Sequence, residues 1–258
     1  MENEMEQFEK AFGAAMASEV VPMDDMMRYV NLARGKRLRP RLVFLSARLF
    51  GGTNDVTLRT ALFVELFHNA TLIHDDVVDD SDMRRGQPSV KAKWNNPAAV
   101  LAGDFLLSKA LTQLSHPSDQ PILKEMLQTA IAITEGELVQ VLSPLREAKV
   151  SEYLEMIERK TARLIRSCCV GGALSVQASE EAINKIGAFG LNLGLVFQMR
   201  DDILDDDVPE ITPLAKQLLP DYLDKTLKDL EALTPYIHDK EALAALRELT
   251  VFCAERDH

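Results

Sequence analysis

The sequence is poor in cysteine, in glycine and proline, and in long apolar runs. Only 3 of its 258 residues are cysteines, and two of them, Cys168 and Cys169, are adjacent. So few thiols cannot form the disulfide framework of a small secreted protein, and a reducing, cytoplasmic compartment is expected. The 12 glycines and 11 prolines are too few for a collagen-like or low-complexity chain.

Signals for export or membrane insertion are also lacking. No stretch approaches the roughly 18 uninterrupted apolar residues that a membrane-spanning helix needs. The first ten residues, MENEMEQFEK, are acidic and have no apolar core of the kind a signal peptide carries. We therefore expect a soluble protein without a membrane span. Its net charge of −11 disfavours nucleic acid and anionic membranes as partners, so an anionic ligand would need a local basic patch or a bridging cation.

Helical periodicity is present along almost the whole chain. Hydrophobic residues make up 47% of the sequence, enough for a full core at this length, and they recur at helical spacing, as in Leu42, Leu45 and Leu49. We find no convincing two-residue alternation and no Asn-Gly or Asp-Gly hairpin signal. The pattern predicts a single all-α domain over residues 1–258. Its helices are expected to break near residues 51–54, 86–88, 95–97, 116–118, 143–144 and 208–209.

Two acidic segments interrupt this apolar pattern. HDDVVDDSD (74–82) and MRDDILDDD (199–207) each hold five aspartates in nine residues. Residues four apart share a helix face, so Asp75 projects with Asp79, and Asp201 with Asp205. Carboxylates this close repel one another and retain protons unless a cation neutralises them. Hard oxygen ligands suit Mg²⁺ or Ca²⁺, and Mg²⁺ prefers one or two carboxylates together with phosphate oxygens.

Simpler explanations of these segments are less satisfactory. A solvated helix end would explain one acidic cluster, but two clusters of the same DDxxD form weaken that explanation. A calcium-binding loop fails because Arg85 stands where the loop requires glycine. Nucleotide-binding and zinc motifs are missing. Basic residues at 35–40, 84–85 and 160 are each ordinary surface charges when taken singly. Together with the acidic clusters they favour a ligand that carries phosphates.

Six segments carry a family resemblance. The sequence resembles the trans-isoprenyl diphosphate synthases, the polyprenyl branch in particular, over roughly residues 30–207. The first aspartate motif with its following RRG is the most specific match. The matching segments, in the order found in that family, are GKRLRP (35–40), FHNATLIHDDVVDDSDMRRGQPS (67–89), GDFLLSKA (103–110), EGELVQ (135–140), KTARLI (160–165) and GLVFQMRDDILD (194–205).

The resemblance implies head-to-tail condensation of isopentenyl diphosphate with an allylic diphosphate, in a helical bundle around a central cavity. The product would be a medium- or long-chain polyprenyl diphosphate, and the protein a homodimer packed through residues 95–135. Asp75, Asp79 and Asp201 would be the ligands of the Mg²⁺ ions that bind the allylic diphosphate. Asp202 and Asp205 would support these ligands or contact the metal through water. The other implied roles are direct contact with that diphosphate (Arg84, Lys160), binding of isopentenyl diphosphate without metal (Lys36, Arg39, His68, Arg85) and oxygen dipoles for the allylic cation (Thr161, Gln198 and the Lys160 carbonyl).

Product length is expected to depend on the helix that precedes Asp75. Ala70 lies five residues before Asp75 and Phe67 eight before it, and we expect both to line the path of the growing chain. Short-chain members of the family usually have an aromatic residue at the position of Ala70, so alanine predicts products longer than fifteen carbons. The alternative is that both residues simply pack in a helix interface.

The chain departs from the family after the second aspartate motif. The expected Gly-Lys-rich loop is absent, and Asp205 is followed at once by residues 206–213 and then by a segment, 214–256, that resembles the family's C-terminal helices. A real internal deletion and a loop missing from the sequence both remain open. The departure raises a second hypothesis, a non-catalytic or regulatory subunit of a two-component prenyltransferase, although both aspartate motifs are intact. A terpene cyclase is disfavoured because Asp205 and Pro209 stand where that family has Ser or Thr and Glu.

Overall fold

A computed structural model describes residues 1–33, 35–142, 149–206, 208 and 210–256. Almost all of them are helical, which confirms the predicted all-α class. The helices are α1 (Glu2–Met16), α2 (Val21–Leu32), α3 (Leu38–Leu49), α4 (Asp55–Val78), α5 (Val90–Lys93), α6 (Asn96–Gln113), α7 (Gln120–Leu142), α8 (Val150–Ile157), α9 (Arg163–Ser175), α10 (Glu180–Asp205), α11 (Thr212–Glu231) and α12 (Lys240–Glu255).

The predicted breaks at 51–54 and 116–118 fall between α-helices and the one at 95–97 falls at the start of α6, whereas the breaks before α2, α3, α10 and α12 were not predicted. Short polar side chains cap several of the helix starts. Asn54 and Thr57 form a reciprocal capping box at the start of α4, and Asn95 accepts the Ala98 N–H at the start of α6. Ser179 caps α10 in the same way. These caps satisfy backbone groups that would otherwise lack partners. The predicted breaks at Ser143-Pro144 and at Pro209 lie outside the described residues.

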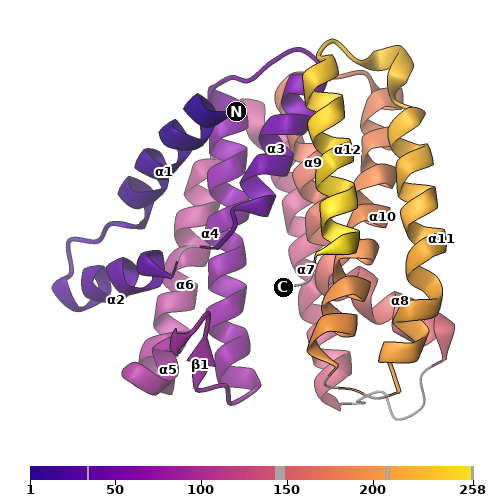
Figure 1. Cartoon of the computed structure of the whole chain (residues 1–258). Coiled ribbons are helices and arrows are strands. Elements are labelled where there is room, and N and C mark those ends of the chain that lie inside the picture. Colours follow the sequence, from indigo (N-terminus) through magenta and orange to yellow (C-terminus); the bar gives the residue numbers. More distant parts are fainter. Residues whose placement is uncertain (34, 143–148, 207, 209, 257–258) are drawn as a thin grey trace.

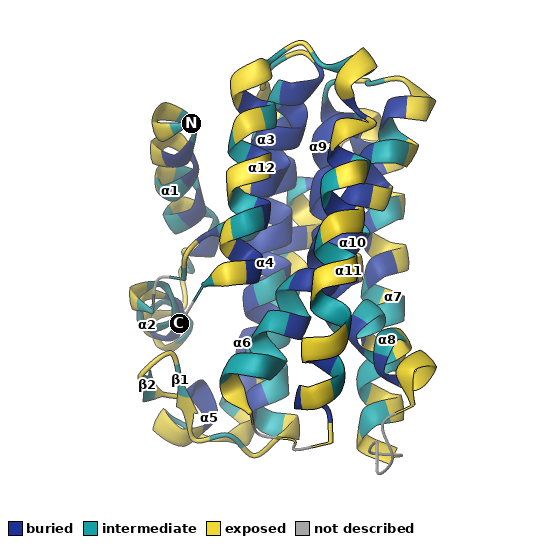
Figure 2. Ribbon diagram, turned by 45° about the vertical axis from the view of Figure 1, so that its right-hand side comes forward, coloured by how far each residue is buried: buried dark blue, intermediate teal, exposed yellow. Residues whose placement is uncertain are grey.

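Helices α3, α4, α9 and α10 form the centre of the bundle. In Figure 1, α6 and α2 lie on one side of α4, whereas α11 and α8 lie on the far side of α10. Figure 2 shows buried residues on the faces that the central helices turn toward one another. Fully buried side chains such as Leu42, Leu66 and Phe189 fill this region. A second apolar cluster, which includes Tyr153, lies between α8, α10 and α11.

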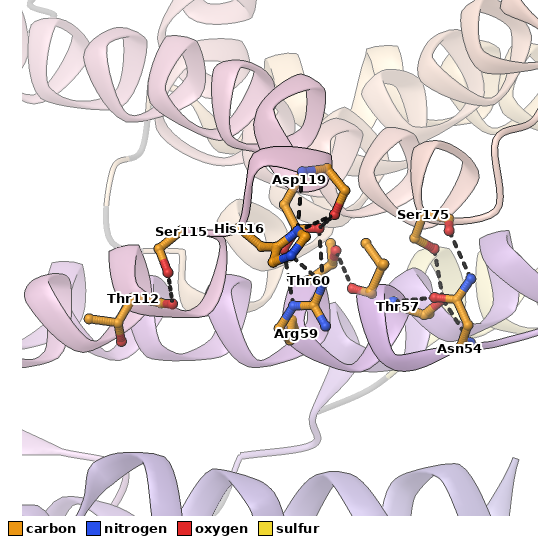
Figure 3. A network of polar contacts seen from close by, with 11 residues as sticks. Asn54, Thr57, Arg59, Thr60, Thr112, Ser115, His116, Asp119 and Ser175 are labelled. Carbon is orange, nitrogen blue, oxygen red and sulfur yellow. Dashed lines mark hydrogen bonds and ion pairs between the residues drawn. The ribbon is translucent and has the colours of Figure 1, made fainter.

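One end of α4 is fixed by the polar network of Figure 3. Asn54 Nδ2 donates to the Ser175 carbonyl at 2.9 Å, and the hydroxyls of Thr57 and Ser175 are 2.7 Å apart. One turn later, Arg59 holds the buried carboxylate of Asp119 at 2.9 Å. The start of α4 is thereby fastened to α9 and to the 3-10 turn before α7, so the helix can position residues at its opposite end.

The connection that follows α4 contains strands that the sequence did not predict. Met83–Arg84 (β1) pairs antiparallel with Gln87–Pro88 (β2). Arg85 and Gly86 form the turn, with φ values of 52° and 78°. Positive φ at both central residues is the geometry of a tight hairpin turn. Two-residue strands are too short to show any alternation in sequence, which is why no strand was expected here.

Candidate active site

A cavity of about 850 Å³ opens between the central helices. Its walls come from α3, α4, α7, α9, α10 and α12, the β1–β2 hairpin, and the turn that joins α8 to α9. The residues predicted to bind magnesium, to hold either diphosphate or to face the allylic cation line it, except Asp79. Those residues are Lys36, Arg39, His68, Asp75, Arg84, Arg85, Lys160, Thr161, Gln198 and Asp201.

The carboxylates of the first aspartate motif point in different directions, one into the cavity and another into the protein. Asp75 faces the cavity, and its pKa is raised to about 6, first by burial and then by the nearby charge of Glu137, with a further contribution from Asp79. Asp79 is the exposed C-terminal cap of α4, and its N–H donates to the Asp75 carbonyl at 2.8 Å. Asp76 turns into the protein and accepts from Arg84 Nε at 2.8 Å and Nη2 at 2.6 Å. Asp76 thus orients Arg84 on the cavity wall.

The acidic residues suit a divalent cation that is shared with a ligand. Among the residues that the structure describes, no three His, Cys, Asp or Glu side chains converge on one point as a complete metal cage. Asp75 on α4 and Asp201 on α10 instead both line the cavity. Mg²⁺ is commonly held by one or two carboxylates plus phosphate oxygens and water. The hard oxygen donors present therefore fit magnesium if a phosphate-bearing ligand completes its coordination.

Glu137 of α7 is a site residue that the sequence analysis did not single out. Its Oε1 lies 3.0 Å from Lys160 Nζ, and Gln140 Oε1, one turn along α7, lies 3.4 Å from the same nitrogen. Together they hold the lysine ammonium beside Asp75. The segment EGELVQ contains both residues, and their three-residue spacing puts them on one helix face. Nothing in that segment alone indicated that Lys160 lies opposite.

Lys160 and Thr161 stand in a π-helical turn, Glu158–Ala162, within an otherwise continuous helix. Single π-turns of this kind are frequent at functional sites because they displace side chains from the regular helical positions. α10 approaches this turn at Gly194, where an added Cβ would lie 2.8 Å from Ala162 Cβ. One turn further along α10, Gln198 Oε1 accepts a hydrogen bond from Thr161 Oγ1 at 2.6 Å.

The second aspartate motif meets the C-terminal helix. Asp201 forms an ion pair with Arg256, the residue that caps α12, and the Arg256 guanidinium lies 4.2 Å from the Phe197 ring centroid. Arg200 Nε also donates to the Arg256 carbonyl at 2.7 Å. Burial raises the pKa of Asp201, and the charge of Arg256 opposes that shift. Arg256 was noted in sequence only as part of a helical pattern, because no local signal links it to residue 201.

The remaining wall is cationic and lacks matching carboxylates for some of its donors. Arg39 Nε is buried and has no hydrogen-bond partner among the described residues. Arg85 Nη1 donates to the Ala33 carbonyl at 3.0 Å, and Arg85 also lines the cavity. His68 has a pKa well below its ordinary value, because of burial and then the positive charge of Arg39. A neutral imidazole between two guanidiniums can donate one hydrogen bond to an anion.

Arg37, next to Lys36, has a structural role and is not one of the predicted ligand-binding residues. It pairs with Glu65 at 2.7 Å and with Glu9 of α1 at 2.9 Å, and all but 7% of its surface is buried. Its backbone adopts a positive φ of 52° immediately before α3 begins. The pairing fixes the segment from which Lys36 and Arg39 reach the cavity.

Ala70 and Phe67 do not line this cavity, contrary to the sequence-based expectation. Both are buried in the main core, with 2% and 6% of their surface exposed. Five residues turn an α-helix by about 500°, which places Ala70 roughly 140° away from Asp75 around the axis. Thr71, four residues before Asp75, shares its face and lines the cavity, as does Leu72.

Comparison with known proteins identifies the family of this chain. The polyprenyl synthetase family model matches residues 21–226. The chain belongs to the polyprenyl synthetase family. It is 36% identical over 198 residues to component 2 of the heptaprenyl diphosphate synthase of Geobacillus stearothermophilus, an alignment that covers 76% of this chain and 62% of that protein. It is 41% identical over 189 residues to the geranylgeranyl diphosphate synthase of Methanosarcina mazei, covering 71% and 58%.

Solved structures of the family extend the likeness to the rest of the chain. The crystal structure of a polyprenyl synthase from Caulobacter crescentus, complexed with calcium and isoprenyl diphosphate, aligns with a TM-score of 0.87 at 27% identity, covering 100% of this chain and 96% of that one. In sequence, the chain spans about 60% of the length of the curated relatives it matches. No helix among the described residues is long and apolar enough to cross a membrane.

The structure describes part of the region where the sequence departs from the family. α10 ends at Asp205 and α11 begins at Thr212. Asp207 and Pro209 lie outside the described residues. The C-terminal helices expected from residues 214–256 are present as α11 and α12, and they pack against α10 as Figure 1 shows.

Proposed function

We propose that this chain is a magnesium-dependent prenyltransferase that condenses isopentenyl diphosphate head-to-tail with an allylic diphosphate. The product is a medium- or long-chain polyprenyl diphosphate. The observation that carries this proposal is that one cavity is lined both by carboxylates on α4 and α10 and by cations at the start of α3 and in the hairpin. Such a cavity has separate places for a metal-bound diphosphate and for one held by cations alone.

Asp75, Asp79 and Asp201 are the residues that would hold magnesium. When bound there, the ion supplies Lewis-acid chemistry to the leaving diphosphate. Arg84 and Lys160 are assigned direct contact with the same diphosphate. Both are oriented by carboxylates, Arg84 by Asp76 and Lys160 by Glu137. Side chains fixed in this way cost less entropy when they bind the substrate.

The second diphosphate is assigned to Lys36, Arg39, His68 and Arg85. The unpartnered Arg39 Nε supports this assignment, because a buried donor without an acceptor is costly unless a ligand satisfies it. Neutral His68 can donate to an anion and adds no charge to a site that already contains two guanidiniums. Guanidinium groups bind phosphate oxygens with two parallel hydrogen bonds, which also fixes the ligand's orientation.

Other residues of the cavity wall suit an allylic cation. Ile133 and Leu164 contribute apolar surface, and Thr161 and Gln198 contribute oxygen atoms. Apolar walls exclude water that would otherwise capture the cation, and oriented dipoles stabilise the positive charge. The alkene of isopentenyl diphosphate then attacks, and the released diphosphate takes up the proton. No side chain is required as a base.

We also propose a homodimer and a cytoplasmic location. The homodimer is supported by a row of apolar side chains that remain exposed on α6 and α7, within the predicted range 95–135 and just beyond it. The location is supported by the three cysteines, all free thiols buried in the fold.

The decisive experiment is a turnover assay with purified full-length chain. Isopentenyl diphosphate is supplied with dimethylallyl, geranyl or farnesyl diphosphate, with magnesium or with EDTA, and products are sized by mass spectrometry. We expect elongation that requires magnesium and is lost in Asp75→Ala. Elongation that persists in EDTA, or in Asp75→Ala, would contradict the proposal.

A regulatory subunit remains the second candidate because the chain spans only part of the length of its relatives. It predicts no elongation with any primer by the chain alone. It also predicts that the chain changes the rate or product length of a separate, active synthase to which it is added.

A further inference from the structure

Tyr153 of α8 is completely buried in the apolar cluster between α8, α10 and α11, yet it makes a strong polar contact. Its hydroxyl donates to Asp202 Oδ2 at 2.6 Å. A buried tyrosine hydroxyl usually requires a partner, and a carboxylate is the strongest acceptor that a protein offers. Asp202 belongs to the second aspartate motif but does not line the cavity among the described residues.

The hydrogen bonds continue from Asp202 to the cavity. Asp202 Oδ1 accepts from Gln198 Nε2 at 2.9 Å, so both oxygens of this carboxylate are engaged by protein donors. The opposite side of the same amide, Gln198 Oε1, accepts from Thr161 Oγ1 at 2.6 Å. Tyr153, Asp202, Gln198 and Thr161 therefore form one continuous chain, which we call the Tyr153 relay.

The direction of the hydrogen bonds in this chain determines which end of the Gln198 amide faces the cavity. Both oxygens of the Asp202 carboxylate act as acceptors, so the Gln198 amide can form a hydrogen bond to this carboxylate only through its NH₂ group. The amide oxygen must then point the other way, toward Thr161 and the cavity that both residues line. The reversed amide would place its oxygen against a carboxylate oxygen, and two acceptors at hydrogen-bond distance repel each other.

We infer that Tyr153 is a positioning residue, which acts through Asp202 to fix the Gln198 amide with its oxygen toward the cavity. The functional meaning rests on the proposed prenyl transfer. An oxygen dipole stabilises a positive charge that develops next to it, whereas an N–H in the same place would oppose that charge. Tyr153 itself is screened from the cavity and touches no substrate.

The test replaces Tyr153 by phenylalanine, which keeps the buried ring and removes only the hydroxyl. The matched control is Tyr222→Phe, because Tyr222 packs against the same cluster but is not part of the relay. The probe is a pair of allylic diphosphate analogues, one with an ammonium group at the cationic carbon and one uncharged isostere, titrated calorimetrically in magnesium. The measured quantity is the ratio of their two dissociation constants.

We expect wild type and Tyr222→Phe to bind the ammonium analogue more tightly than the isostere. Tyr153→Phe should lose about tenfold of this preference, the effect expected when one oriented dipole is released. In turnover, kcat should fall while KM for each substrate changes less than about threefold, because the interaction is realised only as the cation forms. An unchanged ratio in Tyr153→Phe would overturn the inference.

A double-mutant cycle separates positioning from general loosening of the fold. If Tyr153 acts through Gln198, then Tyr153→Phe should have little further effect on the affinity ratio when Gln198 is already alanine. Equal effects in the two backgrounds would show that the relay does not transmit the change. Should Tyr153→Phe fail to fold, Asp202→Asn tests the same relay. The asparagine NH₂ group would face either the Tyr153 hydroxyl or the Gln198 NH₂ group, so one of these two hydrogen bonds would lose its acceptor.

The outcomes also separate this inference from the proposed function. If wild type binds neither analogue and elongates no primer, prenyl transfer is wrong, and the role of the relay falls with it. If wild type elongates primers but Tyr153→Phe behaves like Tyr222→Phe, the function stands and only the inference is lost.

Discussion

The carboxylate of Asp75 is held in the folded protein at an energetic cost. Its pKa rises from 3.8 to about 6, chiefly through burial, so folding favours its protonated form. The group costs nothing below pH 3.8, where it is protonated in both states, and destabilises the folded protein as the pH rises through about 6. Metal-free protein should therefore lose stability over this range through this residue.

Asp75→Asn should remove that cost and also remove the metal ligand. In EDTA at neutral pH we expect the variant to be more stable than wild type by about 1–2 kcal/mol, with the gain shrinking toward pH 4. Turnover should fall by at least about a hundredfold. Urea unfolding at several pH values, followed by the elongation assay, checks both statements. A gain in stability that does not depend on pH would contradict the assigned cause.

Arg256 offers a second test at the scale of one residue, because its positive charge is paired with the Asp201 carboxylate. Arg256→Gln should weaken the metal-free fold by about 1–3 kcal/mol, since Asp201 loses its partner. It should also increase Mn²⁺ affinity several-fold, since the cation that competes for this carboxylate is gone. Paramagnetic resonance of free Mn²⁺ measures the affinity. Arg247→Gln is the control, as Arg247 lies on the same helix and pairs with Glu231 at 3.0 Å; equal affinities in the two variants would be contrary to expectation.

Residues that belong to one contiguous motif are those that the structure brings to the cavity as the sequence predicted. The spacing of Asp75, Lys160 or Gln198 within a helix sets the face on which each lies, and the family resemblance supplies a role. Glu137 and Arg256 were not predicted as site residues, because their importance depends on which helix packs opposite them. Ala70 was misplaced because its role was inferred from distance along the helix, whereas its angle around the axis turns it into the core.

At the scale of elements, the approach of α10 to the π-helical turn decides whether Thr161 and Gln198 meet. Gly194→Ala should push these elements apart, since its Cβ would lie 2.8 Å from Ala162 Cβ. We expect a loss of about 1–3 kcal/mol of stability and a lower kcat. Gly13→Ala in α1, where nothing lies within 4 Å, should instead be neutral or stabilising by up to about 1 kcal/mol. Urea unfolding compares the two, and equal effects would show that the close approach is not what matters.

Elements were predictable to different degrees for identifiable reasons. Helices with a buried face and a cap, such as α4 and α10, have both periodicity and terminal signals in sequence. The π-helical turn at Lys160 has neither, because one extra residue in a turn leaves the apolar pattern almost unchanged. The β1–β2 hairpin rests on two positive φ values at Arg85 and Gly86, and arginine is not a residue that signals such a turn.

For the whole molecule, the sequence indicated an all-α bundle but not how the helices are arranged. That arrangement gives α7 two different faces. Its buried face includes Ile122, Met126 and Ile133, whereas Leu127, Ile131 and Leu138 form an exposed apolar row along the helix. A surface helix normally keeps one apolar stripe, turned to its own core. A second stripe on the outside indicates contact with another protein surface.

We expect this row to hold a homodimer, so Ile131→Glu should dissociate it. Placing a charge in the middle of an apolar interface leaves it without solvent or a partner, which costs several kcal/mol in each of two symmetric positions. Leu32→Glu is the matched control, because Leu32 is 77% exposed at the end of α2, on the other side of α4 in Figure 1. Sedimentation velocity at micromolar concentration should show a dimer for wild type and Leu32→Glu and a monomer for Ile131→Glu. A wild-type monomer would contradict the homodimer and would favour the subunit hypothesis, in which a different protein covers the exposed row of α7.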